Sequence, residues 1–169
     1  MTNRRYLGNG IISSTGTPEN AINDAFNKGY WREAFSLLDA EIDKLLESGL
    51  RSKYNESKEQ DVINAFIQAT KKRGFAEICM KILVKEKIIS GNLKSNIQKF
   101  KEIRNIVLHN VFPANEILQK RYKKWWETIT TEEQFKNTFK NILGNDLRTA
   151  LGNWRELLEI NRSYSELKK

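Results

Sequence analysis

The chain has 169 residues, with 29 Lys and Arg against 21 Asp and Glu, so its formal net charge is +8. This length suits one domain with a single core. A single cysteine, Cys79, excludes an intramolecular disulfide, and a single histidine excludes a metal site built on several histidines of one chain, so no metal or other cofactor is expected. No stretch approaches the ~18 apolar residues of a membrane span. We also expect no signal peptide and a cytoplasmic location.

The N-terminal third predicts an arm followed by two helices. Residues 1–16 mix Gly, Ser, Thr and Asn with two arginines, and we expect a flexible arm there. Thr17 and the proline after it predict a helix start, because threonine caps helices and proline suits the first turn. Apolar residues then recur at helical spacing. Gly29 is expected to divide this stretch into a short and a long helix, and Gly49 to end the second one.

Helical periodicity continues through the rest of the chain, and no segment alternates convincingly with period two. We expect helices at 59–73, 75–88, 93–111, 114–128 and 131–143, and a last helix ending near residue 160. Asn92 is expected to cap the third of these, and Thr131 opens a capping box for the fifth. Gly144 separates the last two helices. The predicted fold class is all-α, an antiparallel helical bundle over residues 17–160, with a frayed tail at 161–169.

The excess positive charge is concentrated in one segment. Residues 71–124 hold 14 Lys and Arg and 4 Asp and Glu, a balance of +10, while the remainder of the chain holds 15 and 17, a balance of −2. Such clustering is what a phosphate-rich partner would require. The alternative is a set of solvated faces on basic helices.

The most informative segment is 101–112, a nearly continuous apolar run interrupted by Arg104, Asn105, His109 and Asn110. Polar groups in apolar surroundings need partners, so this helix end is either buried with its polar groups satisfied or lines a cleft. Asn105 and His109 share a helix face, whereas Arg104 and His109 lie about 140° apart around the helix. The helix dipole favours protonated His109, which makes it a candidate general acid or base, with Arg104 a candidate phosphate ligand.

The pattern Arg104-Asn105-x-x-x-His109 resembles the Arg-x4-6-His motif of the HEPN superfamily, compact all-α domains that are often ribonucleases. In that family a polar residue often follows the arginine, and the motif lies near the C-terminal end of a late core helix, as here. The resemblance covers roughly residues 18–160. One toxin subgroup has a tyrosine two residues after the histidine, where this chain has Val111, so regulation through that tyrosine is not expected.

The resemblance implies that the protein is a metal-independent endoribonuclease. The biological role that it implies is that of a toxin or a phage-defence effector. The ribose 2′-hydroxyl would attack the adjacent phosphate, with His109 as general acid or base and Arg104 on the scissile phosphate. Asn105 would orient the histidine or hold the phosphate. RNA and a second copy of the chain are the implied partners, together with an antitoxin or regulatory protein. The alternative is a non-catalytic helical module that binds RNA or a protein.

A second basic cluster follows at residues 120–126, where basic and aromatic side chains interleave, as phosphate contact and base stacking require. The residues predicted to bind RNA are Lys101, Lys120, Arg121, Lys123 and Lys124. Tyr122 and Trp125 share one helix face with Leu118 and Ile129, and for the aromatic residues we favour core or dimer packing. Two further features have simpler interpretations: Asp39 and Asp43 suit a solvated helix face, and Cys79 suits an inert core position.

Overall fold

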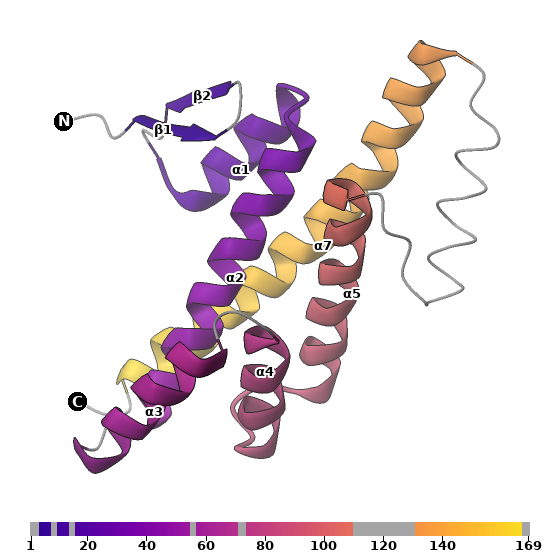
Figure 1. Cartoon of the computed structure of the whole chain (residues 1–169). Helices are drawn as coiled ribbons and strands as arrows, with labels where there is room; N and C mark the ends of the chain where they lie inside the picture. The colour runs from indigo at the N-terminus through magenta and orange to yellow at the C-terminus, as the bar shows by residue number, and fades with distance from the viewer. Residues whose placement is uncertain are drawn as a thin grey trace. The chain divides into compact units, whose positions relative to one another are not determined.

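A computed structural model of the chain describes residues 4–7, 10–13, 16–54, 57–70, 74–109 and 131–166 (Figure 1). For the strands and for some helical positions, His109 among them, the description covers the backbone alone. The described elements, in chain order, are β1 (Arg4–Leu7), β2 (Gly10–Ser13), α1 (Pro18–Asn27), α2 (Trp31–Lys53), α3 (Ser57–Thr70), α4 (Phe75–Lys85), α5 (Gly91–His109) and α7 (Glu132–Glu166).

Helices make up almost all of the described chain, which confirms the predicted helical class. The exception is an antiparallel hairpin in which β1 pairs with β2, from Arg4 opposite Ser13 to Leu7 opposite Gly10. The composition of residues 1–16 predicted a flexible arm here, and the hairpin corrects that prediction. A signal for the hairpin was present, because the residues between the strands are Gly8 and Asn9, types typical of two-residue hairpin loops.

Three predicted helix boundaries are confirmed by their local geometry. The Thr17 hydroxyl accepts a hydrogen bond from the Asn20 backbone N–H at 3.3 Å, with proline at the first position of α1. Gly29 separates α1 from α2 with φ of +84°, a conformation that favours glycine. Thr131 caps α7 by accepting from the Gln134 backbone N–H at 3.2 Å. Each of these signals is local in sequence, and each works as expected.

Two other glycines were wrongly predicted to end helices. α2 continues through Gly49 to Lys53, and α7 runs through Gly144 as one helix of 35 residues, past residue 160 to Glu166. Both glycines lie against a neighbouring side chain. A Cβ at Gly49 would lie 3.4 Å from Asn161 Oδ1, and one at Gly144 would lie 3.4 Å from Phe26. A helical glycine costs about 1 kcal/mol relative to alanine, which tertiary packing readily offsets.

The described chain divides into two compact units. The first consists of residues 1–39 and 99–151, and the second of residues 40–98 and 152–169. The helices α2, α5 and α7 each contribute one part to each unit. In the first unit the buried apolar side chains come from α1, α2, α5 and α7, and in the second they come from α2 to α5 and α7.

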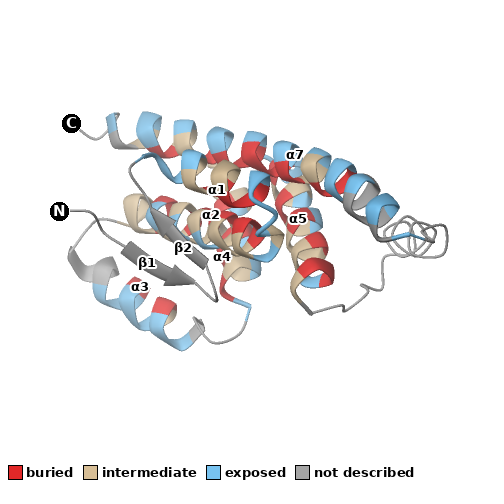
Figure 2. Ribbon diagram, turned by 90° about the horizontal axis from the view of Figure 1, so that it is seen from above, coloured by how far each residue is buried: buried red, intermediate tan, exposed pale blue. Residues whose placement is uncertain are grey.

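The helices are amphipathic, as the periodicity predicted. Figure 2 shows buried and exposed residues on opposite sides of helices such as α7. The buried set is dominated by Leu, Ile and Phe, and Leu38, Ile42 and Leu46 on α2 have no exposed surface. Burial of such a stripe is the main source of stability of a helical protein. Among the described helices, none is both long and apolar enough to cross a membrane.

Candidate functional site

The candidate site lies on the last three turns of α5. This helix begins after Ser90, whose hydroxyl accepts from the Leu93 backbone N–H at 3.0 Å, so Ser90 and not the predicted Asn92 is the cap. Its apolar face buries Ile103, Ile106 and Val107. The periodicity of that face places the polar residues of the predicted motif on the remaining sides of the helix.

Asp39 on α2 binds both basic side chains of this part of α5. Its Oδ1 lies 2.6 Å from Lys101 Nζ, and its Oδ2 lies 3.3 Å from Arg104 Nε. Lys101 and Arg104 are three residues apart and therefore share a helix face. The side chains are 13% exposed for Asp39, 22% for Lys101 and 29% for Arg104. Two cations and one carboxylate leave this half-buried cluster with a net charge of +1.

Arg104 is also bound to its neighbour in the motif. Its Nη1 donates a hydrogen bond to Asn105 Oδ1 at 2.9 Å. Asn105 is exposed and shares a helix register with His109, four residues later. The guanidinium therefore extends around α5 toward the side that Asn105 occupies. The separation of about 140° between Arg104 and His109 describes their positions on the helix backbone. The arginine side chain is long, and its guanidinium reaches Asn105, which lies between these two positions around the helix.

An apolar layer beside the cluster fixes the two helices that carry it. The rings of Phe35 on α2 and Phe100 on α5 stack with centroids 5.8 Å apart and planes inclined by 19°. Both rings are buried. Phe35 lies one turn before Asp39, and Phe100 directly precedes Lys101. Packing of the two rings thus brings the carboxylate of α2 within reach of the cations of α5.

Asp39 is a site residue that the sequence did not predict, since the helical pattern places it with Asp43 on a solvated face. The correction is that Asp39 is mostly buried and makes two ion pairs across to α5. Its partners are 62 and 65 positions away in the sequence, and no local pattern reports such a contact. The only available signal was its place on α2, one turn after the buried Phe35.

The other predicted site residues are placed only in part. His109 is the last residue of α5, one turn beyond Asn105. Asn110 and the basic residues Lys120, Arg121, Lys123 and Lys124 lie outside the described residues. Their predicted contact with RNA stays a prediction. Lys101 is also predicted to contact RNA, and in the structure its ammonium group binds the carboxylate of Asp39.

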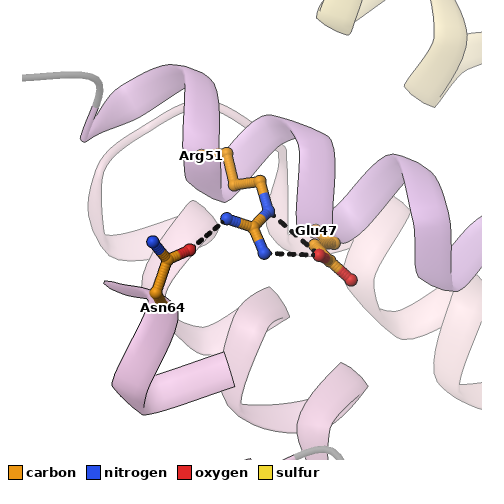
Figure 3. A network of polar contacts seen from close by, with 3 residues as sticks. All are labelled: Glu47, Arg51 and Asn64. Atoms are coloured by element: carbon orange, nitrogen blue, oxygen red, sulfur yellow. Dashed lines mark hydrogen bonds and ion pairs between the residues drawn. The ribbon is translucent and has the colours of Figure 1, made fainter. Parts of the chain in front are cut away.

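A second arginine cluster in the chain has a similar composition and a different setting. Arg51 on α2 donates from Nε and Nη2 to Glu47 Oε1 at 2.9 and 2.8 Å, and from Nη1 to Asn64 Oδ1 on α3 at 2.5 Å (Figure 3). All three guanidinium nitrogens are therefore bound within the chain. Arg51 links α3 to α2, and its full set of internal partners indicates a structural role.

Cys79 occupies the core position that the sequence predicted. It has no exposed surface. Burial, and secondarily the charges of Asp43 and Glu47, raise the pKa of its thiol to about 12. A thiol that remains protonated at neutral pH is a poor nucleophile and metal ligand. Across the part of the chain that the structure describes, no group of three or more His, Cys, Asp and Glu side chains is placed to hold a metal ion.

Comparison with known proteins identifies no relative. No protein-family model matches the sequence, and neither the curated proteins nor the solved structures contain a significant match. The functional interpretation therefore depends on the residues of the cluster on α5 and on the chemistry that they permit.

Proposed function

We propose that the protein is a metal-independent endoribonuclease of the HEPN type. The observation that carries this proposal is the arrangement of Arg104, whose guanidinium is bound to Asn105, one turn before His109, the last described residue of α5. A basic chain supports it, because the net charge of +8 favours association with a polyanion. The helical class of the described chain agrees with the resemblance stated above.

The reaction follows from the chemistry of these side chains. The ribose 2′-hydroxyl attacks the adjacent phosphorus and loses its proton, and the bond to the 5′-oxygen of the next nucleotide breaks as that oxygen gains a proton. His109 transfers one of these protons as general base or acid. Arg104 binds the scissile phosphate and stabilises the charge that develops on its oxygens. The products are a 2′,3′-cyclic phosphate and a 5′-hydroxyl.

Arg104 keeps donor capacity for such a phosphate. Its Nε faces Asp39 and its Nη1 binds Asn105, and within the described residues no partner is found for Nη2. A planar guanidinium oriented by one hydrogen bond and one ion pair presents its remaining nitrogen in a defined direction. In Arg51, by contrast, each of the three nitrogens donates a hydrogen bond inside the chain.

The active species proposed is a homodimer with its two-fold axis near residues 104–109, so that two copies share one groove. Ile103, Ile106 and Val107 are buried within the chain, so the dimer is proposed from the resemblance to HEPN proteins, many of which work as dimers. A toxin or phage-defence effector is the biological role proposed, with an antitoxin or another regulatory protein as the partner that restrains it.

A specific observation favours a second candidate function, a non-catalytic helical module that binds RNA or a protein. Arg104 pairs with Asp39, and such an ion pair between α2 and α5 is also what a structural arginine would make. In that case Arg104 and Lys101 stabilise the fold, and the basic surface alone binds the partner.

The substitution His109→Ala separates the two functions. Wild-type protein is expected to inhibit growth on expression and to cleave a fluorescent oligoribonucleotide when purified, whereas His109→Ala should do neither. RNA binding, measured with an uncleavable 2′-O-methyl oligonucleotide, should be retained by the variant. Equal cleavage by purified wild type and His109→Ala would contradict the proposed role of the histidine. RNA binding without cleavage by either protein would establish the binding module instead.

A further inference from the structure

Asp39 presents its two carboxylate oxygens to two different cations of α5. Oδ1 receives Lys101 Nζ at 2.6 Å and Oδ2 faces Arg104 Nε at 3.3 Å. The Nε atom is buried and makes no hydrogen bond, so its contact with Oδ2 is an ion pair. With Asn105 on Nη1, the guanidinium is held along one side by an acid from α2 and at one end by its own neighbour. Two fixed points define the plane of the group.

We propose that Asp39 is a positioning residue for the RNA cleavage proposed above, on which this inference rests, and that Lys101 compensates for its charge. A carboxylate that anchored Arg104 alone would cancel the arginine's charge and weaken its attraction for phosphate. Because Lys101 binds the same carboxylate, the cluster keeps a net charge of +1. The anchor therefore orients Arg104 without neutralising the site.

The two roles predict opposite effects in two variants. Asp39→Asn removes the anchor and raises the charge of the cluster from +1 to +2, so cleavage should slow while RNA binding holds or tightens. Lys101→Met lowers the charge from +1 to 0 and leaves the anchor in place, so RNA binding should weaken more than the rate at saturation. A purely structural Asp39 would give parallel changes in both quantities, since both would follow the folded fraction.

A double variant isolates the anchor from the charge. In Asp39→Asn/Lys101→Met, Arg104 alone supplies the charge of +1, equal to that of the wild type. In Asp39→Asn alone, the two cations Lys101 and Arg104 lose the carboxylate between them and repel each other. The double variant removes this repulsion, so it is the decisive test if Asp39→Asn alone does not fold. RNA affinity should match the wild type, and the rate should stay low. Glu47→Gln is the matched control, because it removes the carboxylate partner of Arg51 on the same helix.

The experiment measures single-turnover cleavage of an oligoribonucleotide and, separately, the Kd for its 2′-O-methyl analogue, after thermal unfolding has shown that each protein is folded. In Asp39→Asn and in the double variant we expect the rate to fall about 10- to 100-fold, the size of effect that misplacement of a catalytic group produces. Glu47→Gln should retain the wild-type rate and Kd.

The results distinguish the two proposals. An active wild type together with an unchanged rate in Asp39→Asn or in the double variant overturns the positioning role alone. Parallel loss of rate and affinity in both variants also overturns it and makes Asp39 structural. A wild type that binds but does not cleave RNA overturns the proposed function, and the positioning role with it.

Discussion

Replacing Arg104 with alanine should abolish most cleavage at a small cost in stability. The arginine contributes one ion-pair contact with Asp39 and one hydrogen bond to the exposed Asn105. Removing one member of a buried ion pair can cost about 3–5 kcal/mol when the other charge is left alone. Here Asp39 keeps Lys101 at 2.6 Å. We therefore expect a loss of about 1–2 kcal/mol, the sum of one partly buried ion pair and one hydrogen bond.

That loss should lower the Tm by about 2–8 °C, since 1 kcal/mol corresponds to about 2–4 °C in a chain of this size. A domain stable by about 5–15 kcal/mol would remain almost fully folded at 25 °C. Cleavage, by contrast, should fall about 10²- to 10³-fold, the usual effect of removing one donor that stabilises developing charge. The predicted loss of activity therefore cannot arise from unfolding.

Thermal unfolding and the cleavage of a fluorescent oligoribonucleotide measure the two effects in the same preparation. Arg51→Ala is the matched control, because Arg51 also pairs with a carboxylate and an asparagine and is 34% exposed, against 29% for Arg104. It should lose similar stability and keep its activity. If Arg104→Ala loses no more activity than Arg51→Ala does, the assignment of Arg104 to the phosphate is refuted.

Further predictions concern the metal independence of cleavage, the assembly of the chain and the buried thiol of Cys79. Cleavage should survive excess EDTA, because the proposed nucleophile is the ribose 2′-hydroxyl; loss with chelator and recovery with magnesium would contradict this mechanism. Light scattering at micromolar concentration should give twice the monomer mass, and RNA binding should weaken steeply with salt; a monomer that cleaves at full rate would contradict the shared groove. Burial raises the pKa of Cys79 to about 12, while an unfolded thiol titrates near about 8.5. Between these two pKa values the unfolded chain binds fewer protons than the folded one, so the free energy of unfolding falls as the pH rises. Urea unfolding should show a steeper fall in the wild type than in Cys79→Ala, and equal slopes would refute this.

Local sequence signals predicted the helices well where the cause of the structure is itself local. Thr17 and Thr131 satisfy backbone donors within their own first turns. Gly29 adopts a positive φ that other residues avoid, and it ends α1. The hairpin formed by residues 4–7 and 10–13 is the exception, because its two four-residue strands show no clear alternation of apolar and polar residues.

The glycines at 49 and 144 show where local signals fail. A glycine ends a helix only when no packing opposes the break, and its neighbours along the chain do not report that packing. Gly49 lies against Asn161, whose amide donates to the Leu45 carbonyl at 3.2 Å from a position 116 residues away. Such contacts between residues far apart in the sequence keep α2 and α7 helical across Gly49 and Gly144.

The same division holds for the candidate site. The sequence by itself determined the helical class and the order Arg104, Asn105, His109 along one helix end, because the 3.6-residue period and the local cost of polar groups in an apolar run can be read along the chain. The ion pairs of Arg104 and Lys101 with Asp39 depend on tertiary contacts between α2 and α5. Asp39 reaches these cations because Phe35 on α2 stacks against Phe100 on α5. That stacking joins residues far apart in the sequence, so no local pattern predicts it.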